Sequence, residues 1–326
     1  MNFDRPIFVI GAPRSGTSIL FRMLSLHPEF WHLPAESHRI LEGPWHPQRF
    51  DFSSNRVNAE DVTASDAALI QSQFRESVLN LNLVGATPEK MLEGHGLWGR
   101  LKNRTEIRIS GRKSRRQLPK NDIRLLEKTP KNALRIPALA QVFPDARFIF
   151  LHRDAAQTID SLIAGWLAVD RIGPFRRHRF AASGYPIMTE IRLSRCVSPR
   201  WKFALPPRWR QLDGHDIADA AALQYFSCSE IARRDLAELP SERVLTLEHK
   251  QLVVDPVAVA KKCLAFAQVS DDAVVSRFAA NLPLVNQTSK RNPGHAALRH
   301  AADVERVIGE NRWKKAALQS AEAVAQ

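Results

Sequence analysis

Cysteine and long apolar runs are scarce in this sequence, and each scarcity excludes a class of protein. The chain has 326 residues but only three cysteines, Cys196, Cys228 and Cys263, which are too few and too scattered for a disulfide framework. No cysteine pair has the Cys-x-x-Cys spacing of a zinc site, and no apolar run approaches the ~18 residues of a transmembrane helix. The first residues lack the basic-then-apolar pattern of a signal peptide, so we expect a cytoplasmic protein without a membrane-spanning segment.

The composition is otherwise that of an ordinary globular protein, with 44% hydrophobic and 25% charged residues. The charge is not balanced, because 47 Lys and Arg face 34 Asp and Glu and leave a formal net charge of +13. A surplus of this size indicates an anionic partner. The anionic partners that we consider are nucleic acid, an acidic membrane surface and a substrate that carries phosphate or sulfate.

Short apolar runs alternate with longer helical patterns along the chain, and there is no internal repeat. The runs that we expect to form buried strands are 7–10, 30–33, 123–127, 147–152 and 244–248. Helical patterns follow at 17–26, 155–166, 216–239, 256–267 and from about 301. This order predicts an α/β fold with a mostly parallel central sheet, in a single domain over 1–326 with insertions at about 100–117 and 167–212.

The strongest local signal is the segment IFVI-GAPRSGTS-ILFRML near the N-terminus. A buried strand ends at Ile10, a loop with Gly11 and Gly16 follows, and a helix opens at Thr17. Glycines let backbone N–H groups converge, and the helix N-terminus adds unpaired donors and about half a positive charge. The segment therefore predicts a site for an anionic group.

The loop differs from the ATP-binding motif G-x-x-x-x-G-K-[ST] at one informative position. Thr17 stands in place of the lysine, Ser18 keeps the Ser/Thr place, and a cation appears earlier, at Arg14. Without the lysine, nothing obvious reaches the terminal phosphates of a triphosphate, whereas a guanidinium can clamp a shorter anionic group bidentately. A P-loop kinase acting on a small molecule is accordingly the second interpretation.

A second anion site is indicated where a later buried strand ends. Arg153 follows the run 147–152, and Ser161 lies eight residues further, about two turns into the next helix. Ligands of open α/β sheets bind at such strand ends, so an arginine and a nearby hydroxyl can hold a phosphate there. In the alternative interpretation Arg153 pairs with Asp154 or Asp160, and Ser161 is a surface residue.

Together, PRSGTS after the first strand and Arg-x7-Ser after a later one resemble the two nucleotide-binding motifs of the sulfotransferase family. Members of that family use 3′-phosphoadenosine 5′-phosphosulfate (PAPS) as co-substrate, and the arginine at position 14 is similar to the bacterial and tyrosylprotein branches. The resemblance covers roughly 1–40, 120–166 and 240–290. It implies a P-loop NTPase-like three-layer α/β/α fold. In the late strand–loop–helix, His249 and Lys250 replace the Glu-Asp pair that is commoner in the family.

The resemblance implies a transferase that moves a sulfuryl group from PAPS to a hydroxyl or amine of an acceptor, with no metal ion. It assigns the 5′-phosphosulfate to Arg14, Ser15, Gly16, Thr17 and Ser18, and the 3′-phosphate to Arg153 and Ser161. The late loop Ser289-Lys290-Arg291 is similar to the basic loop that closes over the 3′-phosphate, which adds Lys290 and Arg291. A solvated charged turn is the alternative for that loop.

Two cations are candidates for stabilising the sulfonate and the bridging oxygen of the donor. Charge grows on that oxygen as it leaves, and a well-placed donor there contributes roughly 3–4 kcal/mol. Arg14 is the first candidate. Lys128, in the segment EKTP, is the second, because family members with a similar segment use this lysine in that role. A surface lysine is the alternative for Lys128.

The acceptor also needs a group that takes its proton. The resemblance assigns that role to Glu36, in the segment HLPAESHRI. His38 and His32 are rivals, since an imidazole titrates near neutrality. In the structural alternative, Glu36 is simply a salt-bridge partner of Arg39.

The two insertions are unusual in composition. Residues 100–116 hold eight Lys and Arg against one acid, and 170–210 combine arginines with aromatic residues. We expect the first to line a groove for an anionic or large acceptor, and the second to contact a glycan, a lipid interface or an aryl ring. No nucleic-acid partner is expected, although a non-catalytic nucleic-acid-binding protein is a third interpretation. Alternatively, the charges are solvated and the aromatic residues cover the core.

Overall fold

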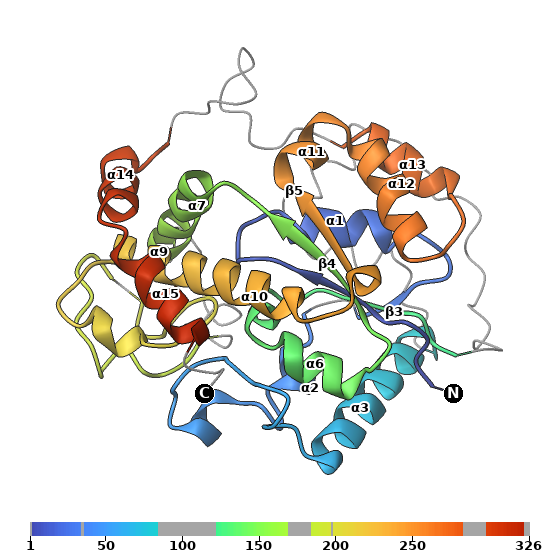
Figure 1. The fold of residues 1–326 in the computed structure, drawn as a ribbon, viewed down its shortest axis with the longest axis horizontal. Coiled ribbons are helices and arrows are strands. Elements are labelled where there is room, and N and C mark those ends of the chain that lie inside the picture. Colours follow the sequence, from blue (N-terminus) through green and yellow to red (C-terminus); the bar gives the residue numbers. More distant parts are fainter. Residues whose placement is uncertain are drawn as a thin grey trace.

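A five-stranded parallel sheet forms the centre of the protein, with its strands in the order β2-β3-β1-β4-β5 (Figure 1). This computed structural model describes residues 2–33, 36–83, 122–168, 184–196, 198–282 and 298–322. The strands are β1 (Ile7–Ile10), β2 (Trp31–His32), β3 (Leu125–Glu127), β4 (Arg147–His152) and β5 (Val244–Glu248). All five predicted strands are therefore present, with β2 and β3 shorter than expected.

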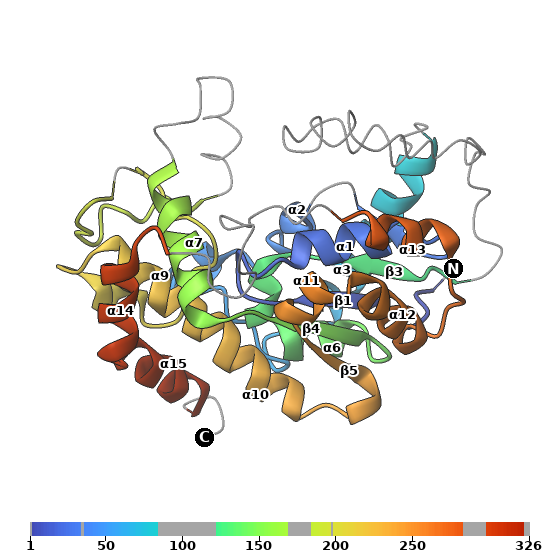
Figure 2. The same ribbon diagram turned by 90° about the horizontal axis from the view of Figure 1, so that it is seen from above.

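Helices connect and cover the strands. The α-helices are α1 (Thr17–Leu24), α2 (His38–Leu41), α3 (Ala64–Leu83), α6 (Ile136–Val142), α7 (Ala155–Leu167), α9 (Ile217–Phe226), α10 (Ala232–Ala237), α11 (His249–Val254), α12 (Pro256–Phe266), α13 (Ala273–Ala280), α14 (Ala301–Gly309) and α15 (Arg312–Glu322). Short 3₁₀ turns are η1 (Pro47–Phe50), η2 (Pro130–Leu134), η4 (Trp209–Leu212) and η6 (Ser241–Arg243), and η5 (Ser227–Ile231) is a π-helical turn. In both views, α7, α14 and α15 lie together at one end of the molecule (Figures 1 and 2).

The apolar run of β1 is continuous because both faces of the sheet are buried. Ile7 and Val9 belong to the cluster formed with α1, α12 and α13, whereas Phe8 and Ile10 belong to the cluster on the other face, with α6, α7 and α9. All four side chains are fully buried, as the alternation of side chains along a strand requires. The three-layer α/β/α fold predicted from the sequence is confirmed.

The strand order brings three functional segments to one edge of the sheet. β1 lies in the centre between β3 and β4, and the register pairs Phe8 with Glu127 and Ile10 with Phe150. The strands are parallel, so the residues that follow them emerge on the same side. These are the glycine loop after β1, Lys128 after β3 and Arg153 after β4.

Two predicted helices are interrupted. The pattern 216–239 forms α9 and α10 with the π-helical turn η5 between them. The last helical pattern is divided into α14 and α15, because Asn311 adopts a left-handed conformation with φ of 53°. Asp255 is the N-cap of α12, since its side chain accepts a hydrogen bond from the Ala258 N–H and Pro256 begins the helix.

The aromatic residues of the second insertion belong largely to the core. Tyr185, Trp201 and Trp209 are at most 2% exposed, and Trp166 of α7 packs edge-on against Trp201 with ring centroids 5.3 Å apart. The expectation that these three rings offer a stacking surface to an acceptor is therefore wrong. Phe175 and Phe180, like the basic segment 100–116, lie outside the described residues.

No helix in the part of the chain that the structure describes is both long and apolar enough to cross a bilayer.

Candidate active site

The glycine loop after β1 has a geometry that only glycine allows at two positions. Gly16 is the N-cap residue of α1 with φ of 96°, and a Cβ placed there would lie 2.7 Å from Cδ2 of His249. A Cβ on Gly11 would lie 2.7 Å from the carbonyl oxygen of Leu151. The loop therefore packs tightly against the ends of β4 and β5, and its backbone stays open to an approaching group.

The loop presents donors that an anion can use. No side chain caps α1, so the N–H groups of its first turn are not occupied by a capping residue. The hydroxyl of Ser15 is buried and has no hydrogen-bond partner among the described residues, and Thr17 is also buried, while Ser18 is exposed. A buried hydroxyl without a partner is costly, so this donor set fits a bound phosphate or sulfonate group.

Arg14 links this loop to the second predicted anion site. Its backbone is left-handed, with φ of 74°, and its Nε donates to the hydroxyl of Ser161 at 3.1 Å. The Nη1 of Arg153 donates to the carbonyl oxygen of Arg14 at 3.0 Å. The structure thus brings together both motifs, Gly11–Ser18 and Arg153 with Ser161, which are more than 130 residues apart in the sequence.

A third guanidinium joins this pair. Burial lowers the pKa of Arg14, and the nearby charge of Arg299 lowers it further, while burial and Arg14 together lower the pKa of Arg153. Among the described residues, no carboxylate forms an ion pair with any of the three. The charges of Asp154 and Asp160 act on Arg153 in the opposite direction, and an anion bound beside Arg14 and Arg153 would relieve the repulsion between these cations.

The neighbouring aspartates have other partners. Asp154 caps α7 by accepting from the backbone N–H of Gln157 at 3.0 Å, and Asp160 accepts from the backbone N–H of His300 at 2.8 Å. The side chain of Arg153 lies against Gln157 instead. The alternative in which Arg153 pairs with Asp154 or Asp160 is therefore wrong.

Sequence reasoning missed Arg299 and the contact made by His249. Arg299 belongs to no motif, and the segment that carries it is tied to α7 by the hydrogen bond from the backbone N–H of His300 to Asp160. His249 follows β5 directly and packs on Gly16. Burial, assisted by the charge of Arg153, lowers the pKa of His249 to about 4, so its ring is neutral at pH 7.

Lys128 and Glu36 form a direct ion pair. The Nζ of Lys128 donates to Oε1 of Glu36 at 2.6 Å, and the lysine side chain is only 8% exposed. The second carboxylate oxygen, Oε2, lies 2.8 Å from Nε2 of His38. Lys128 is therefore not a surface lysine, and Glu36 is not paired with Arg39. The Nδ1 atom of His32, the other histidine considered as a base, lies 3.0 Å from the carbonyl oxygen of Leu33.

A buried hydrogen-bond network fixes the segment on which Glu36 stands. Glu127, the last residue of β3, accepts from the hydroxyls of Ser37 and Thr129, both at 2.6 Å, and from the amide of Asn132 at 2.8 Å. Burial raises the pKa of Glu127, which these donors partly offset. Thr129 precedes η2 but makes no capping hydrogen bond to it, because its hydroxyl donates to Glu127 in this network.

A second cluster of charges lies behind the site and was not predicted. Oε1 of Glu42 accepts from Nζ of Lys131 and from the hydroxyl of Tyr185, both at 2.7 Å, and from Nη2 of Arg135 at 3.4 Å. His38 faces the same carboxylate, with its Nδ1 3.6 Å from Oε1. Burial opposes ionisation, but the imidazole and the two cations outweigh it and keep the pKa of Glu42 well below its usual range.

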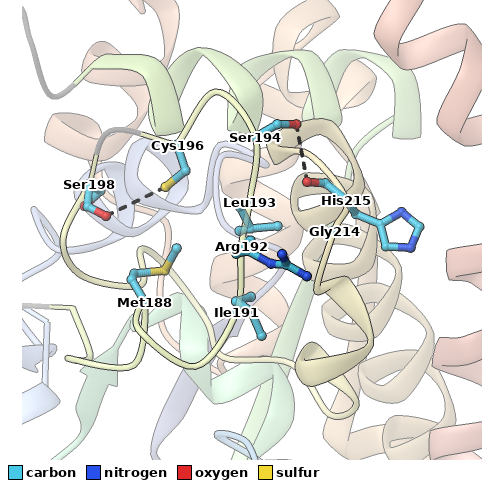
Figure 3. Close-up of a pocket in the computed structure, with 9 residues that line it drawn as sticks. All are labelled: Met188, Ile191, Arg192, Leu193, Ser194, Cys196, Ser198, Gly214 and His215. Carbon is cyan, nitrogen blue, oxygen red and sulfur yellow. Dashed lines mark hydrogen bonds between the residues drawn. The ribbon is translucent and has the colours of Figure 1, made fainter.

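A separate open cavity of about 600 Å³ lies in the segment around 188–215 (Figure 3). Met188, Ile191 and Leu193 supply its apolar lining, and the Cys196 thiol donates to the carbonyl oxygen of Ser198 at 3.7 Å. None of the residues predicted to bind the donor or to catalyse the reaction lines this cavity.

Two of the predicted residues, Lys290 and Arg291, lie outside the described part of the chain. Within that part, no group of three or more His, Cys, Asp or Glu side chains could hold a metal ion.

Comparison with known proteins identifies the family. The model of a family described as "Sulfotransferase family" matches residues 6–189, more than half of the chain, and the protein therefore belongs to the sulfotransferase family and is a transferase. No curated protein sequence matches.

Similar solved structures include sulfotransferase STF9 from Mycobacterium avium, with 17% identity, a TM-score of 0.46, and coverage of 95% of this chain and 76% of that one. A sulfotransferase from Alicyclobacillus acidocaldarius has 16% identity, a TM-score of 0.45, and coverage of 98% and 96%. These values carry no information about the donor or the acceptor.

Proposed function

We propose that this sulfotransferase uses PAPS as its donor and transfers the sulfuryl group to a hydroxyl or amine of an acceptor. The observation that carries the proposal is the contact of Arg14 with Arg153 and Ser161 beside a glycine loop with open donors, where neither arginine forms an ion pair with a carboxylate of the described residues. A ligand with two separated anionic groups satisfies both halves of this site. PAPS is such a ligand, because it carries a phosphosulfate on the 5′ position of adenosine and a phosphate on the 3′ position.

The two halves divide the donor between them. The loop N–H groups with Ser15, Gly16, Thr17 and Ser18 would hold the 5′-phosphosulfate. Arg153 and Ser161 would hold the 3′-phosphate, with Lys290 and Arg291 closing over it. Arg14 stands in the loop and contacts the second set twice, since its carbonyl oxygen accepts from Arg153 and its guanidinium donates to Ser161. We add Arg299 to the second set.

The bound donor supplies an electrophilic sulfur and an anionic leaving group. The acceptor oxygen or nitrogen forms a bond to sulfur while the bond from sulfur to the bridging phosphate oxygen breaks, and that oxygen keeps the electron pair. Lys128 and Arg14 would stabilise the charge on the sulfonate and on the leaving oxygen. The acceptor proton goes to Glu36.

The Lys128–Glu36 ion pair explains how the base becomes effective only with the donor bound. Burial opposes ionisation of Glu36, but His38 and Lys128 outweigh it and lower the pKa of Glu36 to about 2, which makes it a weak base. A lysine that turns to the anionic sulfonate releases one carboxylate oxygen and raises the pKa of Glu36. A base with a pKa nearer to the working pH accepts a proton more readily in the transition state.

Calorimetry with 3′,5′-adenosine bisphosphate and with adenosine 5′-phosphate tests the donor. We expect Arg153→Ala to weaken the bisphosphate roughly 10- to 100-fold, because a charge-assisted hydrogen bond is lost, and to change the monophosphate little. Arg233→Ala is the matched control, since Arg233 is 66% exposed and pairs with Glu230. Equal losses for the two nucleotides would refute the 3′-phosphate role, and a folded protein that binds neither would refute the donor.

The acceptor is sought by incubating the protein with PAPS and glycan, lipid, peptide, phenol and amine acceptors. Mass spectrometry then reads the mass added by a sulfuryl group. Transfer that disappears in Lys128→Ala supports the proposal. Magnesium-dependent turnover of ATP, without transfer from PAPS, would favour the kinase alternative.

A further inference from the structure

The carboxylate of Glu36 is held from two sides, and the proposed reaction accounts for only one of them. Lys128 donates to Oε1 at 2.6 Å, and His38 Nε2 lies 2.8 Å from Oε2. The lysine follows β3, whereas the histidine begins α2, so the two partners stand on different elements. If Lys128 turns to the sulfonate, the contact with His38 is the one that still fixes the carboxylate.

His38 lies between two carboxylates. Its Nδ1 is 3.6 Å from Oε1 of Glu42, four residues further along the chain, and its side chain is 26% exposed. Burial of the ring opposes protonation, but the hydrogen bond to Glu36 and the contact with Glu42 outweigh it and raise the pKa of His38, while the Lys131 ammonium acts in the opposite direction. An imidazolium can direct one N–H at each carboxylate.

The support behind the ring is rigid. Glu42 accepts hydrogen bonds from Lys131 and Tyr185, both at 2.7 Å. Ser37, which separates Glu36 from His38, is held by Thr129 through its backbone N–H at 2.9 Å and by Glu127 through its hydroxyl at 2.6 Å. The Glu36–His38 pair is therefore fixed both through its backbone and through the far side of the imidazole.

We propose that His38 is the positioning residue of the proton acceptor: it holds Oε2 of Glu36 through Nε2–H, so that Oε1 faces the acceptor once Lys128 has turned away. The inference rests on the proposed function of Glu36. The acceptor proton ends on Oε1 of Glu36, and His38 keeps its own protons through the step. A misplacement of a reacting group by about 1 Å can lower a rate by roughly 100-fold, which sets the scale of the effect.

The kinetic test compares His38→Ala with His38→Gln, using PAPS and an acceptor found in the screen. We expect His38→Ala to lower kcat by roughly 100-fold, with unchanged affinity for 3′,5′-adenosine bisphosphate and unchanged KM for PAPS. Glutamine carries an N–H donor at the same number of bonds from Cα as Nε2, so His38→Gln should keep kcat within about 10-fold of the wild-type value. His215→Gln is the matched control, since His215 also faces a carboxylate four residues later, Asp219, at 3.8 Å.

The pH dependence separates positioning from a merely structural role. The wild-type rate should change as the pH passes through the titration of His38, because the charge on the ring alters both its attraction to Glu36 and the basicity of that carboxylate. The His38→Gln rate should lack this inflection. NMR of isotope-labelled histidine should show the His38 titration moving to lower pH in Glu36→Gln, and this measurement needs no acceptor.

Each outcome decides between the inference and the proposed function. Transfer by the wild type with an unchanged kcat in His38→Ala, the same inflection in His38→Gln as in the wild type, or a titration unaffected by Glu36→Gln overturns the inference alone. A wild-type protein that binds the bisphosphate but transfers sulfate to no acceptor overturns the proposed function, and the role of His38 with it. If His38→Ala does not fold, His38→Gln and the NMR titration still decide.

Discussion

Replacing Glu42 by glutamine should destabilise the protein strongly, because this carboxylate is the shared counter-charge of two buried cations. The side chains of Lys131 and Arg135 are 4% and 0% exposed, and both donate to the same oxygen of Glu42. Glutamine keeps the size of the side chain but removes its charge. Leaving a buried charge without its partner costs about 3–5 kcal/mol. We expect a loss of that size in the free energy of unfolding at neutral pH.

Urea unfolding followed by tryptophan fluorescence measures this loss as a lower midpoint with an unchanged slope. Lys131→Met removes one of the two cations, so the double variant Glu42→Gln/Lys131→Met should lose less than the sum of the single losses, by about 0.5–3 kcal/mol. The free energy of unfolding of the wild type should also decrease as the pH is lowered into the acid range. The pKa of Glu42 is lowered on folding from its ordinary value of 4.5, so the unfolded chain takes up the proton first as the pH falls.

The sign of the pH effect follows from this order of protonation. The contribution of Glu42 is complete above about pH 4.5 and declines as the pH falls toward the pKa in the folded protein. Below pH 4.5, the wild-type curve should therefore be steeper than that of Glu42→Gln by up to about 1.4 kcal/mol per pH unit, the value for one proton. A loss below about 1 kcal/mol at neutral pH, together with equal acid slopes, would refute the view that Glu42 balances the two cations.

Three further predictions concern the nucleotide site. Gly16→Ala should lower the free energy of unfolding by about 1–2 kcal/mol, because alanine is strained in the left-handed conformation. The same substitution should weaken binding of 3′,5′-adenosine bisphosphate in calorimetry. Adding His249→Ala removes the clash with the new Cβ but should restore only part of the affinity, because φ stays at 96°. Ser161→Ala should weaken binding of the bisphosphate by about 3- to 10-fold, since the Ser161 hydroxyl no longer accepts the hydrogen bond that holds Arg14 at 3.1 Å. An unchanged dissociation constant in the calorimetric titration would contradict this prediction. Asp154→Ala should lower the free energy of unfolding by about 1 kcal/mol, because the N-cap of α7 is lost. Thermal unfolding measures this loss, and a loss of less than about 0.3 kcal/mol would show that the cap does not stabilise the protein.

The local elements of this fold were predictable because their signals are contained in short stretches of sequence. The continuous apolar runs of β1 and β4, the two loop glycines and the Asp255-Pro256 pair each determine structure through neighbours a few residues away. The prediction that the loop takes a short anionic group depends on Thr17 and Arg14, which can be read directly from the motif. Helix ends were less accurate, since packing decided where the π-helical turn and the break at Asn311 occur.

Only the tertiary structure decided which side chains meet. The charge of Arg299 acts on Arg14 because α14 packs on α7, and the Glu42–Lys131 pair forms because the end of α2 lies against the segment that follows β3. Likewise, the sequence offered only Arg39 as an ion-pair partner of Glu36, and the fold placed Lys128 and His38 there instead. The physical reason is one of range: backbone preferences act over a few bonds, whereas ion pairs and burial depend on distances that the whole folded chain sets.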